Sequence, residues 1–205
     1  MVVVGYGSGP MRLINVLRER LIYNNKVYVY PEFFDSKRDL LNRNYMGYVK
    51  KLWIHRNDII IALYPDYINK ILNVPRNILY VYPIHSLDKD SEFYEQLKQY
   101  YNVIPGYPRM EKLRDYGLHD FCSIFNCSES WYLGAISTTI SEAIEWFWGV
   151  DITGLTIPGW GFRNNIQQPE AIALFIEKLT QGKILKCKQI LRIINMKNHK
   201  VFPYD

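Results

Sequence analysis

The sequence predicts an α/β protein, and more specifically a compact (β/α)8 TIM-like barrel. Short β-branched runs alternate with stretches of helical periodicity along most of the 205 residues, and repeated βα units of this kind build parallel sheets. Eight runs qualify as strands, the number that closes a TIM barrel. An open, doubly wound Rossmann-like sheet is the alternative, because a typical barrel has about 250 residues. In both folds the functional site lies at the carboxyl ends of the strands.

The predicted strands are the runs that are richest in branched and aromatic side chains, and each is bounded by turn residues. They cover residues 2–4, 27–30, 59–63, 78–82, 103–104, 122–125, 131–136 and 150–156. Helices are expected where apolar residues recur every three or four positions, and Thr139 with Glu142 fits a capping box at the start of one of them. The expected helices cover residues 13–21, a stretch that ends near 53, 67–72, 91–100, 139–149 and 169–182.

The composition favours one domain over residues 1–205, with residues 183–205 as a candidate basic C-terminal appendage. The chain is 48% hydrophobic and 22% charged, which is typical of a globular domain. No apolar run approaches the roughly 20 residues that cross a bilayer. The first residues carry no basic segment before their apolar run, so they do not resemble a signal peptide. We therefore expect a cytoplasmic protein, in the host cytoplasm if the protein is viral, with no membrane partner.

Cysteines and histidines do not form a recognisable metal motif in the sequence. Cys122, Cys127 and Cys187 are an odd number without a CxxC pair, so we expect reduced thiols and no zinc site. The four histidines are scattered, without an HxH or HExxH spacing, and no GxSxG elbow indicates a serine hydrolase. We expect neither a metal nor a cofactor.

The charge of the chain favours a polyanionic partner. The formal net charge is +5, and basic residues gather near the C-terminus. Tyrosine and tryptophan, with 17 and 5 residues, can stack on bases or fill a core. The residues that we expect to contact nucleic acid are Lys183, Lys186, Lys188 and Arg192.

Polar or glycine residues follow several predicted strands, where parallel strands bring them to one edge. Asp35 and Ser36 follow the second strand, Asp66 the third and Gly106 the fifth, whereas Gly134 and Asp151 lie within the last two predicted strands. A single aspartate at such a place often caps the next helix. Three carboxylates at one edge favour a functional site.

A family resemblance involves several of these residues. The stretch YLGAISTTISEAIEWFWGVDITGLTIPGWGFRN, residues 132–164, resembles the closing segment of tRNA-guanine transglycosylases, in which a YLMGVG strand, a short helix and G-[IV]-D-M-F-D-C-V-x-P-[TS]-R-x-x-R-N follow one another at the same spacing. FFDS at Asp35 and PDY at Asp66 are similar to two further aspartate motifs of that family. The compact size is similar to that of shortened relatives in phages and archaeal viruses, some of which place 7-deazaguanines in DNA.

The resemblance implies a barrel enzyme that exchanges a guanine-type base in tRNA or DNA for a 7-deazaguanine through a glycosyl intermediate linked to a carboxylate. It implies Asp35 or Asp151 as the catalytic carboxylate. The residues implied to bind the substrate are Ser36, Asp66, Gly106, Gly134 and Arg163. The partners would be a nucleic acid and a purine or 7-deazapurine base.

The sequence also departs from that family. The nucleophilic aspartate of the family falls on Gly154 and an arginine of its motif on Trp160, and the CxCxxC…H zinc site is missing. Asp151 lies three residues before Gly154, so on a regular strand the two positions would face opposite sides.

Two other functions remain open. The GYGSG loop, which begins at Gly5, follows a predicted strand, and Glu32 follows the next strand. This context is typical of a Rossmann-like protein that binds a nucleotide or S-adenosylmethionine, although the full G-x-G-x-x-G spacing is not met. The third hypothesis is a barrel that binds a base or nucleic acid without catalysis.

Overall fold

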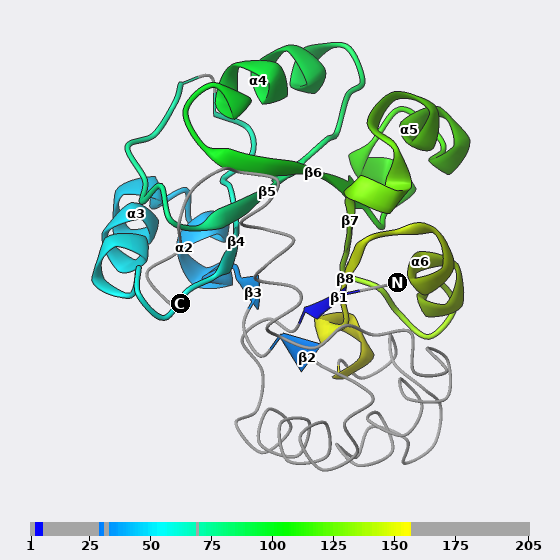
Figure 1. Ribbon diagram of the computed structural model, residues 1–205, viewed down its shortest axis with the longest axis horizontal. Coiled ribbons are helices and arrows are strands. Elements are labelled where there is room, and N and C mark those ends of the chain that lie inside the picture. The colour runs from blue at the N-terminus through cyan, green and yellow to red at the C-terminus, as the bar shows by residue number, and fades with distance from the viewer. Residues whose placement is uncertain (1–2, 6–28, 31–32, 69, 157–205) are drawn as a thin grey trace.

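A computed structural model describes residues 3–5, 29–30, 33–68 and 70–156 of the chain (Figure 1). The strands in these ranges are β1 (Val3–Gly5), β2 (Val29–Tyr30), β3 (Phe33–Phe34), β4 (Ile61–Leu63), β5 (Leu79–Pro83), β6 (Asn102–Pro108), β7 (Trp131–Leu133) and β8 (Gly149–Asp151). The helices are α2 (Lys37–Leu41), α3 (Tyr45–Ile54), α4 (Lys89–Lys98), α5 (Leu118–Phe125) and α6 (Ile140–Trp146). Three 3₁₀ turns complete the list: η1 (Glu111–Leu113), η2 (Cys127–Glu129) and η3 (Thr153–Thr156).

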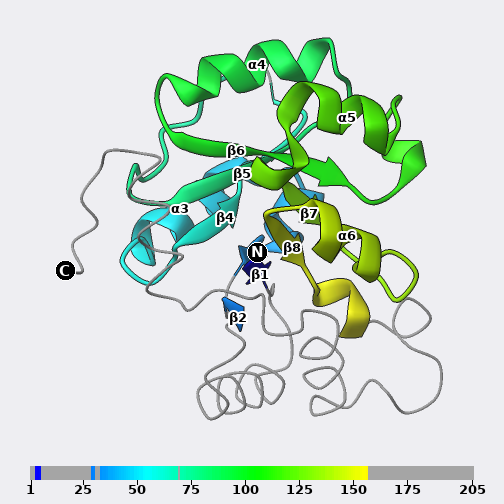
Figure 2. The same ribbon diagram turned by 45° about the vertical axis from the view of Figure 1, so that its right-hand side comes forward.

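All strand pairs are parallel, and the order in the sheet is β2-β1-β8-β7-β6-β5-β4-β3. Helices α3 to α6 lie along the outer side of the curved sheet (Figures 1 and 2). The strands at the two ends of the order, β2 and β3, are consecutive in the chain. Their nearest residues, Tyr30 and Phe33, are three positions apart, so their Cα atoms lie within about 11 Å. The sheet is therefore nearly barrel-shaped.

A contact across the sheet shows how strongly it curves. Phe33 on β3 stacks on Trp131 of β7, with ring centroids 5.4 Å apart and an interplanar angle of 15°. Four strand spacings separate these strands in the order, which in a flat sheet would amount to about 19 Å. The rings meet because the inner face of the sheet curls around them. The predicted parallel α/β class is thus confirmed, whereas an eight-stranded (β/α)8 barrel is not.

Along the strands from β3 to β8, side chains alternate between an inner and an outer core. The inner core contains large apolar residues on the concave side: Phe33, Ile61, Leu79, Val81, Ile104, Trp131 and Trp148. The outer core lies between the sheet and the helices and is rich in tyrosine. Several of its buried hydroxyl groups donate to backbone carbonyls; Tyr80, for example, donates to the Pro75 carbonyl at 2.8 Å. Most aromatic residues of the described ranges are thus core residues.

The structure corrects several predicted elements. Residues 122–125 belong to helix α5 and not to a strand. Phe121 and Phe125, four positions apart, lie on one face with ring centroids 5.0 Å apart, as helical spacing requires. Residues 67–72, apart from 69, which is not described, form bends and not a helix. The strand predicted over 150–156 ends at Asp151, and the 3₁₀ turn η3 begins two residues later, at Thr153. The helices expected over 13–21 and 169–182 lie outside the described residues.

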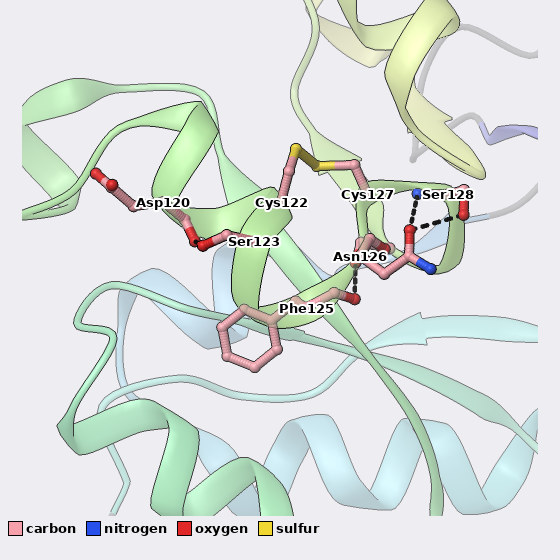
Figure 3. Close-up of a disulfide and its surroundings, with 8 residues drawn as sticks. Asp120, Cys122, Ser123, Phe125, Asn126, Cys127 and Ser128 are labelled. Atoms are coloured by element: carbon pink, nitrogen blue, oxygen red, sulfur yellow. Dashed lines mark hydrogen bonds between the residues drawn. A yellow bond between two sulfur atoms is a disulfide. The ribbon is translucent and has the colours of Figure 1, made fainter.

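The expected reduced state of the cysteines is wrong for two of them. Cys122, near the end of α5, and Cys127, at the start of η2, form a disulfide (Figure 3). Between them Asn126 adopts a positive φ of 56°, which turns the chain and brings the two Cα atoms to 4.8 Å. The expectation of reduced thiols was based on the odd number of cysteines and the missing CxxC pair, and neither feature reveals a turn that brings Cys122 and Cys127 together. Cys187 lies outside the described residues.

No helix in the described ranges has both the length and the apolar character needed to span a membrane.

Candidate functional site

Four polar side chains lie at the carboxyl ends of the parallel strands. Asp35 directly follows β3, Asp66 follows β4 by three residues, His85 follows β5 by two, and Asp151 is the last residue of β8. Because all strands are parallel, these ends lie at one edge of the sheet. The sequence analysis predicted three of these four positions.

Asp35 is a buried carboxylate, with 6% of its surface exposed. Phe33 belongs to the inner core and Phe34 stacks on Tyr48 of α3 on the outer side, so continued alternation points Asp35 inward. The Tyr48 hydroxyl donates to the Leu63 carbonyl at 2.6 Å and lies 3.0 Å from the Phe34 carbonyl, which joins the ends of β3 and β4. Burial raises the pKa of Tyr48, and the negative charge of Asp35 raises it further.

A polar network holds the turn that follows Asp35. Ser36 has a φ of 23°, and its Oγ donates to Oδ2 of Asp39 at 2.6 Å. Lys51 of α3 contacts both Asp39 and Ser36, and Asn44 donates to the other oxygen of Asp39 at 3.2 Å. The pKa of Asp39 is lowered, chiefly by the hydrogen bond from Lys51. Ser36, predicted to bind the substrate, thus has a structural task in this turn.

Asp151 is the second buried carboxylate, 7% exposed. It follows Gly149 by two residues, and a Cβ on Gly149 would lie 2.0 Å from the Trp131 ring, so both residues face the inner side. Its Oδ1 accepts hydrogen bonds from the Thr153 amide at 2.9 Å and the Thr153 hydroxyl at 2.6 Å. Arg109, the first residue after β6, lies within electrostatic range: burial lowers the pKa of its guanidinium, and Tyr132 and Asp151 oppose that shift.

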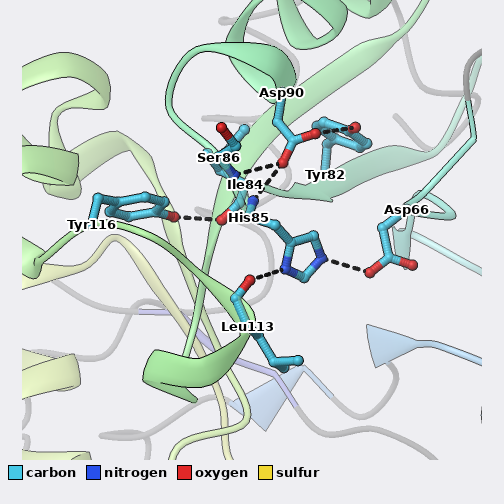
Figure 4. A network of polar contacts seen from close by, with 8 residues as sticks. All are labelled: Asp66, Tyr82, Ile84, His85, Ser86, Asp90, Leu113 and Tyr116. Carbon is cyan, nitrogen blue, oxygen red and sulfur yellow. Dashed lines mark hydrogen bonds and ion pairs between the residues drawn. The ribbon is translucent and has the colours of Figure 1, made fainter.

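Asp66 and His85 form a hydrogen-bonded pair (Figure 4). Nε2 of His85 lies 2.7 Å from Oδ2 of Asp66, and Nδ1 lies 2.7 Å from the Leu113 carbonyl. Tyr67 stacks on the imidazole, with ring centroids 4.5 Å apart. Burial lowers the pKa of His85, but the hydrogen bond and charge of Asp66, the Leu113 carbonyl and the Asp90 charge outweigh it, so the pKa is raised.

The two glycines that we predicted to bind the substrate have different surroundings. Gly106 faces the packed inner core, where a Cβ would lie 2.8 Å from both Leu133 and Val81. Gly134 has a positive φ of 69°, and a Cβ there would meet nothing within 4 Å. Open space at the strand edge therefore exists beside Gly134.

Several predicted site residues lie outside the described residues. They are Arg163 and the four basic residues Lys183, Lys186, Lys188 and Arg192. The same holds for the GYGSG loop beyond Gly5, which ends β1 between β2 and β8. Among the described residues, no three His, Cys, Asp or Glu side chains are grouped so that they could hold a metal ion.

His85 was not among the predicted site residues. The histidines of the sequence match no metal or hydrolase motif, and such motifs do not report a histidine that pairs with an aspartate. The signal that would have found His85 is its place two residues beyond a predicted strand, the same signal that singled out Asp35 and Asp66. Arg109 was visible at a strand end in the same way but was not chosen.

Comparison with known proteins gives one informative result. No family model matches the chain, and no solved structure matches it. The chain is 37% identical over 186 residues to "Uncharacterized protein ORF192" of Acidianus two-tailed virus. The matched region covers 87% of this chain and 92% of the viral protein. Similarity of this extent shows common descent over nearly the whole length of both proteins. The chain therefore belongs to the same family as ORF192 of Acidianus two-tailed virus.

Proposed function

We propose that the protein is a transglycosylase-like enzyme that exchanges a guanine-type base in tRNA or DNA for a 7-deazaguanine. The observation that carries the proposal is the pair of buried carboxylates, Asp35 and Asp151, at the edge of the sheet where the parallel strands end. Ligands of parallel α/β folds bind at this edge. Asp66 adds a third carboxylate at the same edge.

The proposal includes closure of the sheet into a barrel. β2 and β3 pair with β1 and with β4, respectively, so they occupy the two ends of the strand order that closure would bring together. The stack of Phe33 on Trp131 supports such closure. In this arrangement Asp35 and Asp151 would lie at the same mouth of the barrel, above an aromatic floor and on either side of β1.

The chemistry needs one carboxylate as the nucleophile. Its oxygen forms a bond to C1′ of the nucleotide while the bond from C1′ to the base nitrogen breaks, and the electron pair passes to the departing guanine, which takes up a proton from solvent. The incoming base then loses the proton of the equivalent nitrogen, bonds to C1′ and displaces the carboxylate. Asp66, with one oxygen directed away from His85, can accept a hydrogen bond from the N–H edge of either base.

The test is exchange of labelled guanine into tRNA and into DNA. We expect exchange by the wild type and its loss in either Asp35→Asn or Asp151→Asn, because an amide keeps the shape of the carboxylate but is a far poorer nucleophile. The variant that loses activity identifies the nucleophile. Asp58→Asn is the matched control, since Asp58 is exposed and precedes β4 at the opposite end of that strand. Binding of nucleic acid without any exchange would refute the enzyme and leave a binding protein.

The proposed nucleic-acid partner rests on charge. The net charge of +5 and the basic residues of segment 183–205 favour phosphate contacts. Affinity for tRNA or DNA should then fall steeply with salt concentration, and removal of positive charge at Lys183, Lys186 and Lys188 should flatten that slope. Binding that is independent of salt would contradict this part of the proposal. The viral relative fits a role in the cytoplasm of a host cell.

A further inference from the structure

The Asp66–His85 pair has a hydrogen-bond pattern that suits a protonated imidazole. A neutral imidazole has one N–H donor and one acceptor nitrogen. Here both ring nitrogens face oxygen atoms at 2.7 Å, one of the Asp66 carboxylate and one of the Leu113 carbonyl. His85 donates to both oxygens only when both of its nitrogens carry a proton. The geometry therefore favours an imidazolium that is bonded to the Asp66 carboxylate.

The surroundings of the pair stabilise this charged form. Asp90 of α4 accepts hydrogen bonds from the backbone amides of His85 at 2.6 Å and Ser86 at 2.8 Å, so a second carboxylate lies next to the imidazole. Asp66 and Asp90 are the charged groups that act on His85, and both favour its protonation. The His85 side chain is 13% exposed, so solvent screens these charges only in part.

The Asp66–His85 pair is fixed at the oxygen that contacts the imidazole, whereas the other Asp66 oxygen is accessible. Asp66 is 26% exposed, and only its Oδ2 contacts His85, whereas Oδ1 is directed away from the imidazole (Figure 4). Tyr67, which has a positive φ of 57°, covers the imidazole with one face and remains 67% exposed. A planar ring that is set beside a fixed carboxylate oxygen is suited to bind a flat molecule with N–H donors.

We propose that His85 is a positioning residue: as an imidazolium it holds Oδ2 of Asp66, so that Oδ1 can accept a hydrogen bond from the N–H edge of a purine-like base beside Tyr67. The inference rests on the proposed function, because it names the residue that orients the base-reading carboxylate. It goes further in predicting that binding of the free base depends on the protonation of His85, whether or not exchange occurs.

The test is calorimetric binding of 7-deazaguanine over a range of pH. The wild type should bind most tightly at the pH where His85 is protonated, and the affinity should fall as His85 loses its proton. His85→Phe keeps a flat ring under Tyr67 but has no N–H, so it should bind about tenfold more weakly and lose this pH dependence, the usual effect of one missing hydrogen bond. His119→Asn is the control, because His119 is exposed on α5, and it should behave as the wild type.

A second measurement keeps the inference testable if His85→Phe does not fold. Nuclear magnetic resonance of the ring nitrogens should show that His85 stays protonated on both nitrogens to a higher pH in the wild type than in Asp66→Asn. Addition of 7-deazaguanine should shift the His85 signals.

The outcomes separate the inference from the proposed function. If 7-deazaguanine binds as described but no base is exchanged, the inference holds and the enzyme fails. If exchange proceeds and His85→Phe binds the base as the wild type does, the inference is wrong and the enzyme stands. A neutral His85 at the pH of tightest binding, or wild-type protein that binds no 7-deazaguanine, would also overturn the inference.

Discussion

The stack of Phe33 on Trp131 provides a quantitative test of the curved sheet on which the site depends. Both residues are almost fully buried, and their ring centroids are 5.4 Å apart although four strand spacings separate β3 from β7. Stacked or tilted aromatic pairs at such distances contribute about 0.5–1.5 kcal/mol beyond the burial of their area. In a flat sheet the rings would be about 19 Å apart, and substitutions more than about 10 Å apart are additive to within about 0.5 kcal/mol.

The assay is a double-mutant cycle followed by urea unfolding. Phe33→Leu, Trp131→Leu and the double variant should show a coupling free energy of about 0.5–1.5 kcal/mol. A second cycle pairs Phe33→Leu with Phe121→Leu, which lies in the outer core, and it should be additive. Additivity in the first cycle, at unchanged slopes of unfolding against urea, would refute the curled sheet and with it the convergence of Asp35 and Asp151.

Three further predictions concern stability. Gly149→Ala should destabilise the protein by about 1–3 kcal/mol in urea unfolding, because the new Cβ would overlap the Trp131 ring; a neutral effect would contradict the packing. Reduction of the Cys122–Cys127 disulfide should cost about 2 kcal/mol, as expected for so short a loop, and Cys122→Ser with Cys127→Ser should abolish the response to reductant. Folding raises the pKa of His85, so protonated His85 should stabilise the protein fully below pH 6.5, and this stabilisation should disappear as pH rises through the folded-state pKa. A difference in the free energy of unfolding between wild type and His85→Phe that is the same at all pH values would contradict this prediction.

The sequence predicted the sheet well where an apolar run extends over about five residues. The runs 59–63 and 78–82 became β4 and β5 with boundaries shifted by one or two residues. Residues 122–125 were misread because a short apolar run has too few positions to distinguish a period of two from one of 3.6. β3 was missed because it has only two residues. Its pairing with β4 is a tertiary contact, which a local sequence pattern does not indicate.

The candidate site was predictable to the extent that it depends on strand ends. Asp35, Asp66 and Asp151 were found from their places after or within predicted strands, since parallel strands bring their carboxyl ends together. The partners of these residues could not be found in this way. Leu113 contributes a backbone carbonyl to His85 from a segment 28 positions away, and Lys51 reaches the Ser36 turn from α3. Such contacts depend on how the loops pack, which the sequence pattern does not encode.

The position of Gly154 shows why the carboxylate of β8 belongs at Asp151. The sequence analysis assumed that the strand continued through Gly154, but β8 ends at Asp151, where Oδ1 binds Thr153 and begins the turn η3. Gly154 lies in that turn, and a Cβ there would approach the Ala135 carbonyl oxygen to 2.5 Å. A side chain at 154 would therefore displace the backbone of the segment after β7. If Asp151→Asn is the variant that abolishes exchange, we expect that addition of Gly154→Asp restores no base exchange and lowers the midpoint of urea unfolding. Recovery of exchange in that double variant would place the reacting sugar at η3 and contradict the need for a carboxylate at position 151.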